Sequence, residues 1–199
     1  MPTTWLDSVL RQTRRLGDFP YPHWAAVFLN NPVRRWVGRP GDVVEGLGLS
    51  GSERVLELGP GPGYFSVELA RRVPAGGLDL FEVQPEMLER ARRALEAAGC
   101  HSVGFHAGDA SAELPFADAQ FDVAFLAAVL GEVPDKRACI RSLGRVLRPG
   151  SLLVLVEAFP DPDRQSVATL RDLVESEGFT FEGHAGTRWR DVVRFRRQP

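Results

Sequence analysis

The chain has 199 residues, of which 44% are hydrophobic and 25% charged, and its formal net charge is −2 at pH 7. This length and composition are typical of one well-packed globular domain. The small net charge argues against nucleic acid as a partner, and no apolar run approaches the roughly 20 residues that span a bilayer. The two cysteines stand in no metal-ligand spacing, so we expect reduced thiols, no bound metal and a cytoplasmic protein.

Residues 1–50 differ in composition from the rest of the chain. They contain three of the four tryptophans, and prolines interrupt them repeatedly. We therefore expect short helices separated by proline turns. We interpret this segment as a helical extension that belongs to the same domain as residues 51–199.

From residue 53 onward, strand-like and helix-like patterns alternate. Apolar runs predict buried strands over 54–58, 78–83, 102–106, 121–126 and 152–157. Apolar residues spaced three and four apart predict helices over 65–73, 87–98, 140–147 and 167–174. The connection over 107–120 shows no helical period. This alternation predicts a doubly wound α/β fold, with a mostly parallel sheet and helices on both faces.

The C-terminal residues predict a β-hairpin. Residues 179–181 and 189–195 form two strand-like segments, and a turn is expected over 183–186. In the second segment Trp189, Val193 and Phe195 are expected on one face and arginines on the other. Together with the five earlier strands, the hairpin makes a seven-stranded sheet.

The most informative motif follows the first predicted strand, where Glu57 leads into the alternate glycines Gly59, Gly61 and Gly63. Glycine lacks a Cβ, so the backbone here can approach a ligand closely, and the N-terminus of the next helix attracts a negative group. The dinucleotide-binding fingerprint has its last glycine at the sixth position. Because Tyr64 stands there, the turn predicts a pocket for a different small ligand and disfavours a NAD-dependent oxidoreductase.

Acidic residues also end or follow the next two strands. Glu82 ends the second strand about 20 residues after the glycine turn, a position that suits hydrogen bonds from both hydroxyls of a ribose. Asp109 follows the third strand in the sequence Gly-Asp-Ala. Taken alone, Glu82 is equally well a solvated acid and Asp109 a turn former. Because ligands bind at the carboxyl ends of parallel strands, we expect both acids to share one site with the glycine turn.

In this order and spacing, the motifs over about residues 50–197 resemble the class I S-adenosylmethionine-dependent methyltransferases. The likeness is greatest to the ubiquinone/menaquinone-biosynthesis type. The resemblance implies a Rossmann-like sheet with an antiparallel C-terminal strand, and S-adenosylmethionine as the cofactor, with S-adenosylhomocysteine as its product. It also implies transfer of a methyl group to a small-molecule acceptor by in-line displacement. A non-catalytic S-adenosylmethionine-binding module is the alternative function.

The resemblance further implies roles for individual residues. The glycine turn would hold the methionine part of the cofactor, near a helix expected to begin at Gly63. Glu57 would orient the cofactor's amino group, Glu82 would hold the ribose, and Asp109 would accept a hydrogen bond from the adenine. Met87 has a second interpretation, since its helical register also fits core packing. The full set of cofactor-binding residues implied is Glu57, Gly59, Pro60, Gly61, Gly63, Glu82, Val83, Met87, Asp109, Ala110 and Ala127.

The acceptor side is less well marked in the sequence. Many relatives carry one or two histidines after the fourth strand, whereas this chain has Glu132 in that region. Glu132 is either a catalytic group or a solvated acid at a helix start, and Glu157, at the end of the fifth strand, is the second catalytic candidate. Residues 1–50 are either a lid or helices that cap the sheet edge. As a lid, they would supply the substrate-binding residues Tyr21, His23 and Trp24.

Overall fold

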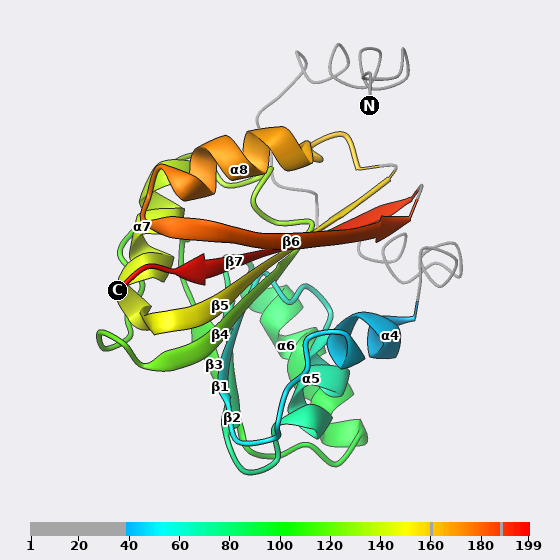
Figure 1. Ribbon diagram of the computed structural model, residues 1–199. Coiled ribbons are helices and arrows are strands. Elements are labelled where there is room, and N and C mark those ends of the chain that lie inside the picture. The colour runs from blue at the N-terminus through cyan, green and yellow to red at the C-terminus, as the bar shows by residue number, and fades with distance from the viewer. Residues whose placement is uncertain (1–38, 160, 188) are drawn as a thin grey trace.

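The computed structural model describes residues 39–159, 161–187 and 189–199, and its described part is built around one seven-stranded sheet (Figure 1). The strand order is β3-β2-β1-β4-β5-β7-β6. Strands β1 to β5 run parallel, and β7 lies antiparallel between β5 and β6. The predicted fold class is confirmed. The strands are β1 (Arg54–Leu58), β2 (Gly77–Glu82), β3 (Val103–Ala107), β4 (Phe121–Ala127), β5 (Leu147–Ala158), β6 (Phe179–Thr187) and β7 (Arg190–Arg197).

Helices cover both faces of the sheet (Figure 1). Helices α4, α5 and α6 pack on one face, against side chains such as Val55 of β1 and Val123 of β4. Helices α7 and α8 pack on the other face, against Leu56 of β1 and Leu153 of β5. Successive residues of a strand point to opposite faces, which explains why these strands are apolar throughout. The helices are α4 (Pro40–Glu45), α5 (Ser66–Arg72), α6 (Pro85–Ala97), α7 (Lys136–Val146) and α8 (Val167–Glu175).

Local sequence signals account for where several helices begin. Pro85 occupies the first turn of α6, where a missing N–H costs nothing. The Asp135 carboxylate caps α7 by accepting a hydrogen bond from the Ala138 N–H at 2.9 Å. The Ser166 hydroxyl caps α8 in the same way. None of the helices in the described ranges is long and apolar enough to cross a membrane.

Several details of the predicted elements are wrong. The first regular turn of α5 begins at Ser66 and not at Gly63, because Gly61 and Gly63 have φ values of +53° and +88°, outside the α-helical region. The turn expected over residues 183–186 is part of β6, which continues to Thr187 after a register shift beyond Phe181. The hairpin tip therefore lies several residues later than expected.

The second strand of the hairpin buries a different set of side chains from the predicted one. Trp189 lies before β7 and is 41% exposed, so it does not share the buried face of Val193 and Phe195. The third inward position is held by Asp191, which is 9% exposed. The expectation for Trp189 was wrong because strict alternation does not extend past the end of the strand.

Most of the N-terminal extension, including Tyr21, His23 and Trp24, lies outside the described residues. Its described end forms α4, whose Val43 and Val44 pack in the same core cluster as Leu69 of α5. This end of the extension is therefore helical, as expected, and contributes to the core of the sheet domain. The assignment of residues 1–50 to the same domain stays a prediction for the rest of the segment.

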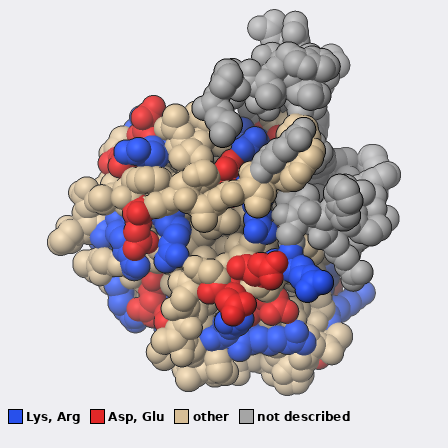
Figure 2. Space-filling model, turned by 45° about the vertical axis from the view of Figure 1, so that its right-hand side comes forward, with Lys and Arg blue, Asp and Glu red and all other residues tan. Residues whose placement is uncertain are grey.

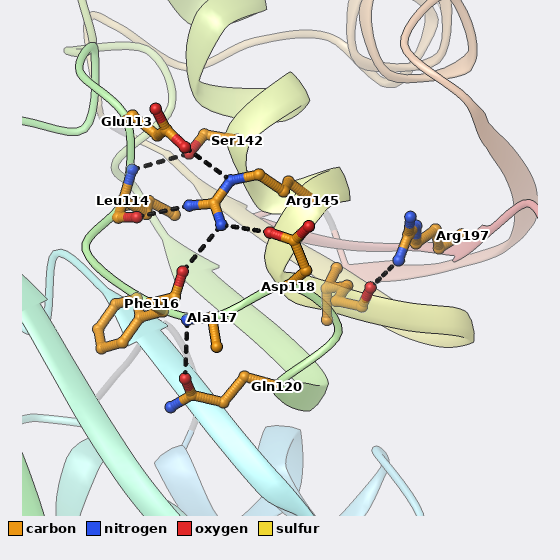
Figure 3. A network of polar contacts seen from close by, with 10 residues as sticks. Glu113, Leu114, Phe116, Ala117, Asp118, Gln120, Ser142, Arg145 and Arg197 are labelled. Atoms are coloured by element: carbon orange, nitrogen blue, oxygen red, sulfur yellow. Dashed lines mark hydrogen bonds and ion pairs between the residues drawn. The ribbon is translucent and has the colours of Figure 1, made fainter.

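The connection between β3 and β4 has no helix, and Arg145 of α7 holds it in place (Figure 3). Its guanidinium donates to the backbone carbonyls of Leu114 at 2.6 Å and Phe116 at 2.8 Å, and it pairs with the Asp118 carboxylate at 2.7 Å. The Ser142 hydroxyl, one turn earlier on α7, accepts from the Leu114 N–H at 2.9 Å. Backbone groups that a helix would satisfy internally are satisfied here by α7.

Candidate cofactor-binding site

The three glycines after β1 have left-handed backbone conformations but different surroundings. A Cβ on Gly59 would lie 2.4 Å from a Val129 methyl, and one on Gly63 would lie 3.1 Å from the Ala91 Cα. A Cβ on Gly61 would meet none of the described residues within 4 Å. Gly59 and Gly63 are thus required for close packing of the turn against the β4 loop and α6. Gly61 borders open space and is the glycine that a bound ligand can approach.

Glu82, at the end of β2, is joined to this turn by a hydrogen bond. Its carboxylate accepts from the Gly61 N–H at 3.2 Å and, through the other oxygen, from the Gln84 N–H at 3.0 Å. The side chain is 7% exposed, and its burial raises the pKa of Glu82, although these amide donors oppose the rise. Each carboxylate oxygen retains a second lone pair, so the group can also accept hydrogen bonds from a ligand hydroxyl.

Glu57 lies beneath the glycine turn and is almost fully buried, with 2% exposure. Within the described part of the chain, its Oε2 atom has no hydrogen-bond partner. Burial raises the pKa of Glu57 to about 8; the Ser66 hydroxyl opposes this rise and the charge of Glu82 adds to it. A buried carboxyl oxygen without a partner is costly unless a donor reaches it. The site therefore fits a ligand that brings a protonated amino group to the turn, as S-adenosylmethionine does.

A close contact between the end of β2 and the residue after β3 brings Asp109 to the same edge of the sheet. The Gly108 N–H donates to the Glu82 carbonyl at 3.0 Å, and a Cβ on Gly108 would lie 2.6 Å from the Phe81 ring. Asp109 follows directly and is exposed, with its carboxylate accepting from the Ser111 N–H at 2.8 Å. The structure thus brings the ends of β1, β2 and β3 to one edge of the sheet.

The remaining predicted cofactor residues divide into exposed and buried side chains. Val83 is 55% exposed next to Glu82, an unusual position for an apolar side chain and one that suits contact with a flat ring. Met87 is 4% exposed, as expected for a core residue. Pro60 is buried and its carbonyl accepts from the Gly63 N–H, while Ala110 and Ala127 are half-buried.

The two catalytic candidates lie in different environments. Glu132 is exposed in the loop after β4. Glu157 is 2% exposed and accepts a hydrogen bond from the Gln165 N–H at 3.0 Å, so the loop after β5 folds over it. Burial raises the pKa of Glu157 to about 7; the Gln165 amide and Arg164 lower it, and the nearby charges of Asp161 and Asp191 raise it.

Sequence reasoning missed a polar cluster beside Glu157. Asp191 of β7 lies opposite Glu157 of β5 in the antiparallel register of these strands. The Asp191 carboxylate contacts His184 at 2.7 Å and forms an ion pair with Arg164. A Cβ on Gly186 would lie 2.8 Å from both the Asp191 and His184 side-chain atoms. The available signal was Asp191 itself, an acid at an inward position of an otherwise apolar and basic strand.

A hollow of about 330 Å³ lies at the opposite edge of the sheet, where Asp122, Arg148 and Gly150 are near the amino ends of β4 and β5. It contains none of the predicted site residues. Asp122 and Arg148 form an ion pair, so these charges are already compensated. The candidate site is instead the carboxyl edge, in agreement with the general placement of ligands on parallel sheets.

Comparison with known proteins supports the fold and the family. Residues 55–150 match the family model of the methyltransferase domain. This part of the chain is a methyltransferase domain. A solved structure of a SAM-dependent methyltransferase from Aquifex aeolicus superposes on this chain with a TM-score of 0.82 and 21% identity, covering 89% of this chain and 99% of that one. The expected Rossmann-like fold is thereby confirmed, and the matched domain agrees with the expected family and with S-adenosylmethionine as its cofactor.

Curated relatives match part of the chain. It is 33% identical over 131 residues to the ubiquinone/menaquinone biosynthesis C-methyltransferase UbiE of Pectobacterium atrosepticum. The match covers 65% of this chain and 51% of that protein. It is 32% identical over 128 residues to the O-methyltransferase rstn1 of Aspergillus nomiae, with coverage of 62% and 56%. The chain thus spans about half the length of the curated relatives it matches.

Proposed function

We propose that this protein transfers a methyl group from S-adenosylmethionine to a small-molecule acceptor by in-line displacement. The observation that carries the proposal is the glycine turn, which is hydrogen-bonded to Glu82. Beneath it lies a carboxyl oxygen of Glu57 that has no hydrogen-bond partner among the described residues. The cofactor supplies a methyl group already activated by its sulfonium, so the protein mainly has to align the two reactants and exclude water.

In this proposal the described residues bind the cofactor in three parts. The turn around Gly61 receives the methionine part, with Glu57 accepting from its amino group. Glu82 accepts from the ribose hydroxyls, and its hydrogen bond with Gly61 supports this role because one carboxylate then contacts both the turn and the ribose. Asp109 and the exposed Val83 contact the adenine, the first as a hydrogen-bond acceptor and the second through apolar contact.

On the acceptor side, we favour Glu157 over Glu132 as the residue that assists the reaction. A pKa of about 7 allows a carboxylate to take a proton near neutral pH, and burial is the main cause of that value. Glu132 is exposed, which agrees better with a solvated acid.

The proposed lid with Tyr21, His23 and Trp24 is tested by deleting residues 1–38, which should lower acceptor turnover and leave cofactor affinity unchanged.

The surface charge agrees with a small acceptor. On the side of the molecule shown in Figure 2, acidic and basic side chains of the described residues are interspersed. Nucleic-acid binding faces are instead broadly basic.

We also propose a cytoplasmic location, supported by the free thiols of Cys100 and Cys139, since reduced cysteines are typical of reducing compartments.

Two measurements on the full chain test the function. Calorimetry with S-adenosylmethionine, S-adenosylhomocysteine and NAD should give binding of the first two and none of NAD. Transfer of a labelled methyl group to components of a metabolite extract should then give a product, which is analysed for both C- and O-methylation because the relatives include both kinds. Binding without any labelled product would indicate a non-catalytic module, and binding of NAD alone would contradict the proposal.

A further inference from the structure

Two large apolar side chains stand out among the described residues because they are exposed: Val83, at 55%, and Trp189, at 41%. Both lie at the carboxyl edge of the sheet, Val83 just after β2 and Trp189 at the tip between β6 and β7. Val83 is already placed next to the cofactor residues. Trp189 lies farther along the same edge and is not one of the predicted cofactor-binding residues.

Trp189 forms an aromatic pair with Phe159, the residue after β5. Their ring centroids are 5.4 Å apart and the rings are inclined at 45°. The Phe159 N–H also donates to the Trp189 carbonyl at 2.9 Å, which ties the end of β5 to the hairpin tip. Aromatic side chains held in this way present apolar area with little loss of conformational entropy when a ligand binds.

The strand order separates this pair from the cofactor residues along the same edge of the sheet. The cofactor residues follow β1, β2 and β3, whereas β4, β5 and β7 lie on the other side of β1. β7 is antiparallel, so its start lies at this edge; with strands about 4.8 Å apart, that start is about 14 Å from the end of β1. An acceptor that approaches the cofactor's methyl group from the β4 side therefore extends toward Phe159 and Trp189.

We propose that Phe159 and Trp189 form one wall of the acceptor site and bind a flat, apolar part of the acceptor. The inference rests on the function proposed above and adds to it the part of the chain that selects the substrate. That part is the C-terminal hairpin, which lies beyond the residues 55–150 matched by the family model.

Equilibrium dialysis of the full chain against two related probes tests this wall, with and without saturating S-adenosylhomocysteine. The probes are 2-naphthol, which is flat, and 2-decalol, which is not flat. We expect 2-naphthol to bind at least about fivefold more tightly than 2-decalol. Trp189→Ala should weaken 2-naphthol binding by about tenfold, the effect of losing one apolar ring contact. Trp189→Phe should retain most of the affinity.

The controls separate this inference from the proposed function. Trp189→Ala should leave the affinity for S-adenosylhomocysteine unchanged, whereas Val83→Ala should weaken that affinity. If the wild-type chain binds S-adenosylhomocysteine but not 2-naphthol, the aromatic wall is wrong and the function stands. Equal 2-naphthol binding by wild type and Trp189→Ala, or tighter binding of 2-decalol, also overturns the wall. Failure of the chain to bind S-adenosylhomocysteine contradicts the function instead.

Discussion

The backbone N–H of Gly61 donates to the Glu82 carboxylate at 3.2 Å, across 21 residues of sequence. This bond joins the turn after β1 to the end of β2, the two segments that bracket the proposed cofactor. Glu82 therefore shapes the turn and faces the ligand with the same carboxylate. A change at this residue should affect the cofactor more than it affects the fold.

Glu82→Ala should weaken binding of S-adenosylhomocysteine by about 1–3 kcal/mol, the usual effect of losing a hydrogen bond to a charged group. Isothermal titration calorimetry measures this directly. Glu86→Ala is the matched control, because Glu86 is an exposed acid in the first turn of α6 and should not alter the affinity. An unchanged dissociation constant for Glu82→Ala would mean that the ribose binds elsewhere.

Gly61→Ala should abolish tight cofactor binding and leave the protein folded. Gly61 has φ +53°, so alanine there costs about 1–2 kcal/mol of strain, but its Cβ enters open space and creates no clash. Gly48→Ala is a close control, since Gly48 has φ +68° and equally open surroundings away from the turn. Denaturant unfolding should give similar losses of stability for both variants. Calorimetry should show lost cofactor affinity only for Gly61→Ala.

The buried carboxyl of Glu57 should make stability depend on pH. Burial raises its pKa from 4.5 to about 8, so between about pH 5 and pH 8 the unfolded chain releases the proton while the native state keeps it. The free energy of unfolding should therefore fall as pH rises through this window. Glu57→Gln removes the ionisation and should reduce this fall by up to about 4 kcal/mol.

Urea unfolding at pH 5.5 and pH 8 checks the prediction for Glu57. Glu53→Gln serves as the control, because hydrogen bonds hold the pKa of Glu53 at about 2, below the window. That variant should lose stability by the same amount at both pH values. If Glu57→Gln shows the same pH dependence as the wild type, the carboxyl is already ionised in the native state near neutral pH.

Arg145→Met should lower the free energy of unfolding by about 2 kcal/mol, because two backbone carbonyls of the β3–β4 connection lose a charged donor (Figure 3). Arg141→Met, one turn earlier on α7, removes an exposed ion pair with Glu177 and should change stability by about 1 kcal/mol or less. Chemical denaturation of both variants gives the comparison. Equal effects would show that the connection does not depend on Arg145.

Periodicity and motif spacing were sufficient for most of the fold. The strands and helices around the glycine turn were predicted to within a few residues, because their apolar patterns repeat locally and each fully apolar strand requires cover on both faces. The hairpin was predicted less well. Its turn was misplaced because the register shift beyond Phe181 depends on pairing with β7, which is a contact between strands and leaves no local signal.

The sequence by itself determined the class of site: alternate glycines after a strand that ends near Glu57, followed by acids at Glu82 and Asp109. These are local signals, since each depends on a few adjacent residues and on the general rule that parallel sheets bind ligands at the carboxyl ends of their strands. Only the tertiary structure decided that Gly61 is the glycine beside open space, and that Phe159 and Trp189 meet at the hairpin tip. Both depend on which distant segments pack together, and the positions of those segments follow from the order of strands in the sheet.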